Sequence, residues 1–100
     1  MGATSLQQMI KQAMRKHRAG ELDRAKALYM KILEIQPANP YAISKCGLVC
    51  HQQGDHKTAV RYFRQAVEQT PDQPVLRNNL GNALRKSGDF KGAIEHLQYA

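Results

Sequence analysis

One hundred residues are enough for one small domain with a modest core, but not for a deep active site with walls of its own. Aromatic residues make up only 6% of the chain, and the abundance of Ala, Leu, Gln, Lys and Arg favours helix throughout. The formal net charge of +7 favours acidic partners or nucleic acid in general, although such a surplus is more often a solvated basic face. No membrane-spanning run or signal peptide is present, so the expected location is the cytoplasm.

The first two predicted helices form a pair. In LQQMIKQAMRKHRA, residues 6–19, apolar side chains recur at helical spacing after Thr4 and Ser5, which mark the predicted start. Gly20 then leads into a second amphipathic stretch, which stops at Pro37 because proline cannot continue a helix. The sequence therefore predicts two helices joined by a tight turn.

Two more pairs follow in the same arrangement. Asn39 is a good N-cap, and Pro40 after it suits the first position of the third helix. Asp72 introduces the fifth helix in the same way. Each first helix of a pair runs into Gly, which adopts the left-handed conformation that ends a helix at little cost. Asp55 and Asp89 follow two of these glycines and can cap the next helix.

The three pairs share a period of 34 residues. The turn glycines are Gly20, Gly54 and Gly88, so the differences 54 − 20 and 88 − 54 are both 34. The same period relates Ala25, Ala59 and Ala93. Self-similarity at this spacing indicates stacked helical hairpins, because one hairpin alone cannot bury its apolar stripe.

This pattern resembles the tetratricopeptide repeat. The small residue of the family's first helix falls on Ala13, Gly47 and Gly81, and the alanine of its second helix on the three alanines above. The following aromatic position holds Tyr29, Phe63 and Leu97; the later small position holds Ala66 and Ala100, with Ile32 as a departure in the first repeat. The resemblance implies an all-α fold, a right-handed solenoid of antiparallel helix hairpins. It implies one domain over residues 1–100, with repeats at about 6–39, 40–73 and an incomplete 74–100.

Cys46, Cys50 and the adjacent His51 suggest a metal site, because the two thiols share a helical face. Both cysteines, however, occupy repeat positions that point into the hairpin core, and a zinc site needs four ligands, so buried structural thiols are expected. No catalytic set is legible, since the four histidines lie on different helices: His17, His51, His56 and His96. We therefore expect no enzyme activity in this chain and no cofactor or metal.

The family resemblance implies partner binding in a concave groove lined by the first helix of each repeat. Carried over by repeat position, the groove-facing residues are Gln7, Ile10, Met14, His17, Arg18, Tyr41, Ser44, Leu48, His51, Gln52, Val75, Asn78, Asn82, Arg85 and Lys86. The binding candidates singled out from the second and third repeats are Tyr41, Ser44, Lys45, Leu48, His51, Asn78, Asn79, Asn82, Arg85 and Lys86.

These candidates suit an extended peptide with acidic groups. Asn side chains can bind its backbone, and Arg85 and Lys86 its carboxylates. The alternative is a solvated helix face with no particular ligand. A carboxylate clamp of the kind that holds chaperone C-termini is not expected, because Ile10 and Met14 stand where it needs Lys and Asn. Only Asn79 matches the asparagine ladder of O-linked N-acetylglucosamine transferase repeats.

The preferred hypothesis is a protein–protein interaction scaffold that binds an extended peptide or a partner helix. The alternative is the N-terminal docking region of a larger enzyme, such as a glycosyltransferase or sulfotransferase. Nucleic-acid binding through the basic face is a third, less favoured hypothesis. The third repeat stops before its proline, so we expect the array to be interrupted there and to form homo-oligomers through its last helix. The apolar residues on that helix are Ile94, Leu97 and Tyr99.

Overall fold

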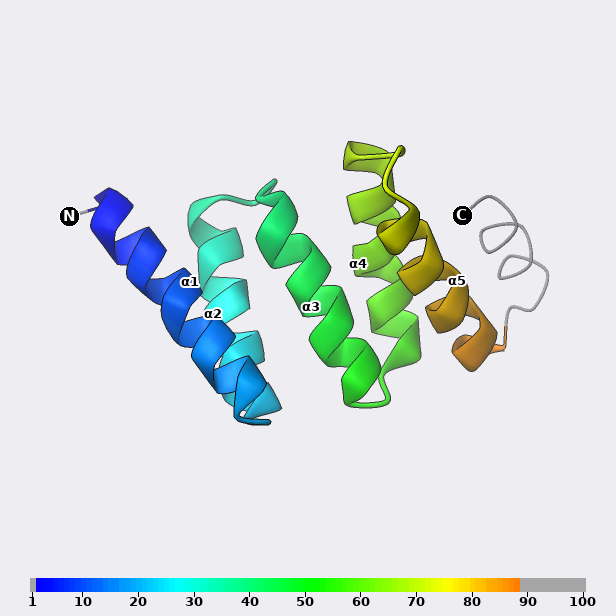
Figure 1. The fold of residues 1–100 in the computed structure, drawn as a ribbon, viewed down its shortest axis with the longest axis horizontal. Helices are drawn as coiled ribbons and strands as arrows, with labels where there is room; N and C mark the ends of the chain where they lie inside the picture. Colours follow the sequence, from blue (N-terminus) through cyan, green and yellow to red (C-terminus); the bar gives the residue numbers. More distant parts are fainter. Residues whose placement is uncertain (1, 89–100) are drawn as a thin grey trace.

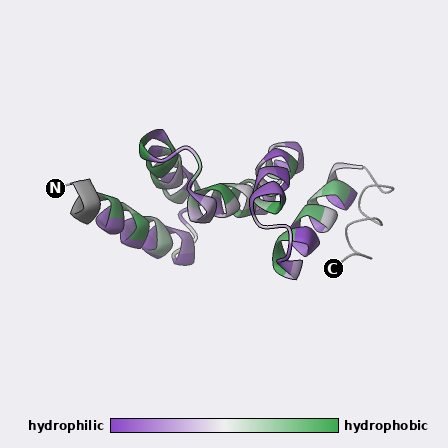
Figure 2. Ribbon diagram, turned by 90° about the horizontal axis from the view of Figure 1, so that it is seen from above, coloured by the Kyte–Doolittle hydropathy of each residue, from purple (hydrophilic) through white to green (hydrophobic). Residues whose placement is uncertain are grey.

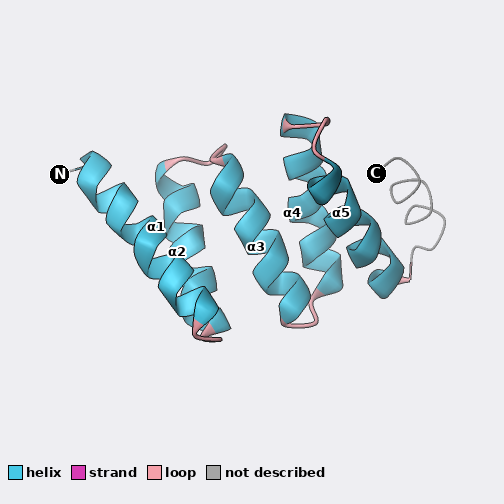
Figure 3. Ribbon diagram, viewed as in Figure 1, coloured by secondary structure: helices cyan, strands magenta, loops and turns pink. Residues whose placement is uncertain are grey.

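The computed structural model describes residues 2–88, with side chains from residue 6 onward, and these residues form five helices. They are α1 (Gly2–Arg18), α2 (Leu22–Ile35), α3 (Pro40–Gln52), α4 (His56–Gln69) and α5 (Pro74–Ser87). Short turns join them, and no strand occurs within residues 2–88 (Figures 1 and 3). The prediction of an all-α solenoid of helix hairpins is confirmed.

The helices stack in two layers along an elongated body of 45 × 25 × 18 Å. Consecutive helices run antiparallel, and each packs against the next in the chain (Figure 1). Seen from above, α1, α3 and α5 lie on one side and α2 and α4 on the other, with α3 set back between α1 and α5 (Figure 2). The odd-numbered helices therefore share one face of the molecule.

The predicted turns and caps are present at most positions. Gly20, Gly54 and Gly88 all adopt positive φ, at 79°, 86° and 99°. The Asn39 side chain accepts a hydrogen bond from the Ala42 N–H at 3.0 Å. Among the described residues, only these three glycines have a left-handed backbone, which favours glycine. The 34-residue period of the sequence is therefore clearest at the turns.

The cap of α4 is also as predicted, whereas two predicted helix starts are wrong. Asp55 accepts from the Thr58 N–H at 3.3 Å. At α5 the N-cap is Gln73, not Asp72, and its side chain makes no capping hydrogen bond. Helix α1 already begins at Gly2, because Thr4 and Ser5 are tolerated inside a helix when nothing forces them to cap it. The predicted cap Asp89 lies outside the described residues.

Two apolar clusters hold the layers together, one on each side of α3. The cluster between α1, α2 and α3, the first junction, consists of Ala13, Ala25, Tyr29, Ile32, Ala42, Cys46 and Val49. The cluster between α3, α4 and α5, the second junction, consists of Ile43, Cys50, Ala59, Phe63, Ala66, Val67, Leu76, Leu80, Ala83 and Leu84. Because α3 supplies residues to both clusters, it is the central element of the described solenoid.

The small residue in α3 is required by a close approach of two helices. A Cβ added to Gly47 would lie 2.7 Å from Cε1 of Phe63, a ring that is fully buried. Such a contact is far inside van der Waals distance, so α3 and α4 can pack at this separation only with glycine here. The small residue at this repeat position therefore allows the close approach of α3 and α4.

Candidate functional site

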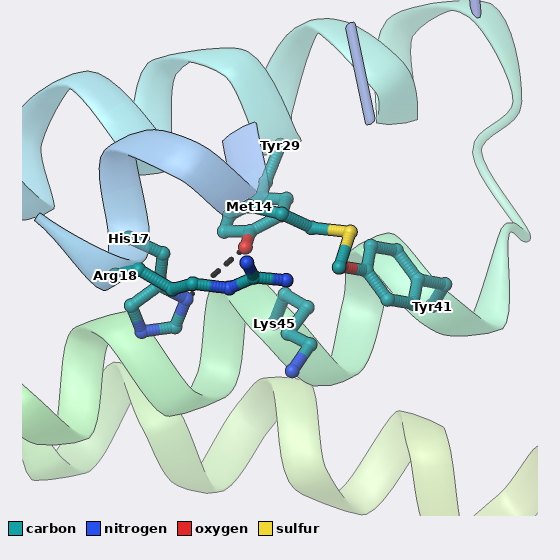
Figure 4. A pocket seen from close by; sticks show the side chains of 6 residues that line it. All are labelled: Met14, His17, Arg18, Tyr29, Tyr41 and Lys45. Carbon is teal, nitrogen blue, oxygen red and sulfur yellow. Dashed lines mark hydrogen bonds between the residues drawn. The ribbon is translucent and has the colours of Figure 1, made fainter. Parts of the chain in front are cut away.

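A cavity of about 220 Å³ opens between α1 and α3 at the first junction. Its lining comes from three helices: Met14, His17 and Arg18 from α1, Tyr29 from α2, and Tyr41 and Lys45 from α3 (Figure 4). Of the candidates singled out from the sequence, this cavity brings together Tyr41 and Lys45. The other four lining residues were expected in the groove or, for Tyr29, in the core.

The imidazole of His17 lines this cavity and is hydrogen-bonded through both of its nitrogens. Its Nδ1 lies 3.1 Å from the Tyr29 hydroxyl, and its Nε2 lies 2.7 Å from Oε1 of Gln52 on α3. With Nε2 donating to the amide oxygen, Nδ1 of the neutral ring accepts from Tyr29. Burial raises the pKa of Tyr29, so its hydroxyl stays protonated and can donate. His17 and Gln52 are predicted to face a ligand, and their hydrogen bonds also join α1, α2 and α3.

The residues of α3 bring a phenol and an ammonium to the cavity. Nζ of Lys45 lies 5.5 Å from the centroid of the Tyr41 ring, within the reach of a cation–π interaction. The Tyr41 ring packs edge-on against Tyr29, with centroids 6.1 Å apart. The Tyr41 hydroxyl is buried and has no hydrogen-bond partner in the described part of the chain. Such a group costs free energy until it is paired.

The cavity is positively charged. Arg18 and Lys45 both line it, and the ion pairs described within residues 6–88 join Glu21 to Lys16 and to Arg24, not to either of these cations. A second cavity of about 270 Å³ lies along α1 and shares Met14 and Arg18 with the first. Its other lining residues, Lys11 and Arg15, are exposed cations. A basic surface therefore runs along α1 into the first junction.

The second junction repeats this geometry with different side chains. Adding 34 to each residue number of the first cavity gives Leu48, His51, Gln52, Phe63, Val75 and Asn79. The ring of His51 packs edge-on against Phe63 at 6.5 Å and 67°, as His17 packs against Tyr29 at 5.9 Å and 74°. Phe63 has no hydroxyl to bond the histidine. His56 takes that role, with its Nδ1 2.9 Å from Nδ1 of His51.

The surroundings of His51 favour its neutral form. Burial lowers its pKa below the ordinary value of 6.5, and the neighbouring His56 and Lys86 lower it further. Lys86 lies 34 residues after Gln52, the residue that bonds His17, so a cation stands here where the first junction has an acceptor. His51, a predicted ligand contact, is thus engaged with His56 and Phe63.

The remaining binding candidates lie on α3 and α5, and the groove residues Gln7 and Ile10 lie on α1. Ser44 and Leu48 are half-buried on α3, where Leu48 packs against the second cluster. On α5, Asn79 and Asn82 are half-buried, while Asn78, Arg85 and Lys86 are exposed. The structure places these residues on an odd-numbered helix, but no described contact tests their predicted role in binding.

The cysteines are core residues. Cys46 and Cys50 are free thiols and fully buried, as predicted. Burial raises the pKa of Cys46 to about 11 and also raises that of Cys50, which keeps both protonated and unreactive. Within residues 2–88 no three His, Cys, Asp or Glu side chains converge as a metal site would require. No helix of this part of the chain has the length and apolar character to cross a membrane.

Comparisons with known proteins give a consistent result. Two family models described as tetratricopeptide repeat match residues 10–74 and 51–99. No curated protein sequence matches the chain.

Solved structures share the fold. The Sgt2 tetratricopeptide-repeat domain from Aspergillus fumigatus is 26% identical, with a TM-score of 0.84 over 92% of this chain and 61% of that one. A mutant O-GlcNAc transferase from Thermobaculum terrenum is 27% identical, with a TM-score of 0.88 over 97% of this chain and 19% of that one. The Yersinia enterocolitica chaperone SycD, in complex with a peptide of the translocator YopD, is 14% identical, with a TM-score of 0.89 over 95% of this chain and 72% of that one. The chain spans about half the length of the MamA structures that it also matches.

Proposed function

This chain belongs to the tetratricopeptide repeat family, and we propose that it is a non-catalytic protein-interaction scaffold. The partner, an extended peptide or a helix, lies along the face formed by α1, α3 and α5. The observation that carries this proposal is the cavity between α1 and α3, which opens among side chains of two odd-numbered helices.

The chemistry of that face supports a peptide ligand. Asn78, Asn79 and Asn82 lie on α5. Each side chain can donate a hydrogen bond to a peptide backbone and accept one from it. Val75 is 67% exposed at the start of the same helix and offers an apolar contact. A cleft with apolar walls and a few directed polar groups is the usual form of a binding site.

The similar structures support the same function. The SycD structure holds a peptide of YopD on the same fold, and the Sgt2 structure is an isolated domain of this repeat. The charge of +7 favours a partner with acidic groups.

The alternative role, as the docking region of a larger transferase, is favoured by one comparison. Nearly all of this chain aligns with only 19% of the O-GlcNAc transferase. The coding sequence downstream of residue 100 tests this role. A glycosyltransferase or sulfotransferase domain in the same reading frame is the expected result, and a stop codon shortly after residue 100 would contradict it.

Selection from a displayed peptide library, followed by fluorescence polarisation of the selected peptides, tests the scaffold function. We expect binding to weaken about tenfold or more when Tyr41 and Asn78 are changed to Ala, since central contacts dominate such interfaces. The matched control changes Arg61 and Arg64 to Ala on α4, in the other layer. Equal weakening by both pairs, or none by the first, would contradict binding on the odd-numbered face.

A further inference from the structure

We propose that the cavity of the first junction is an anion subsite, which takes one carboxylate side chain of the bound partner. The equivalent surface of the second junction takes a neutral or apolar residue instead. This inference rests on the proposed function and adds the chemistry and register of the ligand.

The first argument for a carboxylate ligand is the positive charge of the cavity. Arg18 and Lys45 both line the cavity, from α1 and α3 (Figure 4), and neither forms an ion pair within residues 6–88. Two like charges beside one cavity repel each other, and water screens this repulsion less at the half-buried Lys45 than at the exposed Arg18. A carboxylate between them relieves this repulsion and accepts charge-assisted hydrogen bonds from both.

The second argument is the hydroxyl of Tyr41, which has no hydrogen-bond partner in the described part of the chain. It is a buried donor in the lining of the same cavity, and a carboxylate has two oxygens to accept from Arg18, Lys45 and this hydroxyl. The Tyr41 ring also lies within cation–π reach of the Lys45 ammonium, with its centroid 5.5 Å from Nζ. His17 is not available as a further donor, because both of its nitrogens are bonded to the protein.

The size of the cavity indicates one side chain rather than a cofactor. Pockets for drug-sized ligands measure about 300–1,000 Å³, and this one measures about 220 Å³. An aspartate or glutamate side chain is the kind of group that fits. The rest of the partner must then lie outside the cavity, along the odd-numbered helices.

The internal repeat supplies a control within the molecule. At the second junction the positions of Arg18, Lys45 and Tyr41 are occupied by Gln52, Asn79 and Val75. The cations and the phenol are all absent there, although the backbone frame and the packed histidine are kept. Lys86 still lies near His51 at the second junction. The two junctions therefore differ in charge at the positions of Arg18 and Lys45, while a cation remains near each.

The test is a titration of the isotopically labelled chain with N-acetyl-hexaglutamate amide, followed by ¹H–¹⁵N NMR. We expect the largest shifts at Arg18, Tyr41 and Lys45. R18Q combined with K45N installs the residues of the second junction, and we expect it to weaken binding about tenfold or more, whereas Tyr41→Phe weakens it about twofold to fivefold. The charge-matched control, R61Q with R64Q on α4, removes two positive charges and is expected to leave the affinity within about twofold. Hexaglutamine amide is the neutral control, and thermal melts verify that each variant is folded.

Three outcomes would overturn the subsite. They are equal weakening by the two charge pairs, shifts spread over all basic residues, and tighter binding of hexauridylate than of hexaglutamate at the same amides. A fourth outcome separates it from the proposed function. If library peptides still bind R18Q/K45N with unchanged affinity but lose binding when Tyr41 and Asn78 become Ala, the scaffold function stands and the carboxylate subsite is wrong.

Discussion

The two junctions of this solenoid have the same frame but different chemistry. In each, a histidine near the end of an odd-numbered helix packs edge-on against a buried aromatic ring of the next helix. At the first junction that ring is Tyr29 and the neighbouring cavity is basic. At the second it is Phe63, and the positions equivalent to Arg18 and Lys45 hold Gln52 and Asn79. Repetition therefore fixes the geometry, while single substitutions at equivalent positions set what each junction can bind.

The hydrogen bond of the histidine shows how such substitutions compensate one another. His17 uses the hydroxyl of Tyr29, and His51 uses the imidazole of His56. The residue equivalent to His56 in the first repeat is Leu22, which packs at the rim of the first cluster. Loss of the hydroxyl at one position thus coincides with gain of a polar ring at another. Each half-buried histidine keeps a partner, as buried polar groups require.

The largest expected effect is at the helix crossing. Gly47→Ala places a Cβ against the buried ring of Phe63, whereas the equivalent Ala13 is accommodated beside Tyr29. We expect a loss of about 2 kcal/mol of unfolding free energy, because overpacking outweighs the gain in helix propensity. Urea denaturation measures it, with Ala13→Gly as the comparison, for which we expect about 1 kcal/mol. A stabilised Gly47→Ala variant would contradict the close approach.

A smaller effect is expected from the histidine partners. Tyr29→Phe leaves Nδ1 of His17 without its donor, and His56→Leu leaves Nδ1 of His51 without its partner. Each change converts one junction toward the residues of the other, and each should lower the unfolding free energy by about 1 kcal/mol. Chemical denaturation of both variants beside the parent chain measures this. If both changes were neutral, the two hydrogen bonds would contribute nothing to the frame.

Substitutions at two equivalent helix caps should change the unfolding free energy in opposite directions. Asn39 and Gln73 are equivalent N-caps, but only Asn39 bonds the first turn through its side chain. Asn39→Gln should cost about 1 kcal/mol, and Gln73→Asn should add about 0.5 kcal/mol, because Asn is among the best capping residues. Thermal and urea unfolding report both. A Gln73→Asn variant no more stable than the parent would show that the start of α5 cannot use a cap.

The smallest effect is on the pH dependence of stability. The pKa of His51 in the folded chain is below its ordinary value of 6.5, so the unfolded chain binds more protons between these two values. The unfolding free energy should therefore fall as the pH drops through 6.5 toward the lower, folded pKa. Urea midpoints from pH 7.5 to 5 measure the slope, which should be shallower in His51→Gln. Stability that rises on acidification in this window would contradict the lowered pKa.

The sequence predicted the arrangement of helices and turns well, because that arrangement depends on residue types at particular positions along the chain. Glycines at a constant period, one asparagine cap and one small residue at a crossing each require a particular backbone. The start of α1 was wrong because Thr4 and Ser5 can also lie inside a helix. The expected oligomer contacts, Ile94, Leu97 and Tyr99, lie outside the described residues, so self-association stays a prediction.

The site was harder to predict than the fold. Repeat position put His17 and His51 on the ligand face, but their hydrogen bonds depend on residues 12 and 5 positions away. The sequence assigned the carboxylate contacts to Arg85 and Lys86, and that role is untested. The cavity instead unites Arg18 with Lys45, which lie on different helices, so only the packing of α1 against α3 reveals them as neighbours. A comparison of residues 34 positions apart could have shown from the sequence that Arg18 and Lys45 are replaced by Gln52 and Asn79 in the next repeat.

The central claim is that the two junctions share one backbone geometry and differ in the side chains that bind a ligand. Transfer of the anion site from the first junction to the second tests this claim most directly. The variant V75Y/N79K, made in the R18Q/K45N background, gives the second junction the phenol and ammonium of the first. Titration with N-acetyl-hexaglutamate amide, followed by NMR, should then show the largest shifts at residues 75 and 79 and recover part of the lost affinity. Shifts that stay at the first junction, or affinity that does not recover, would contradict it.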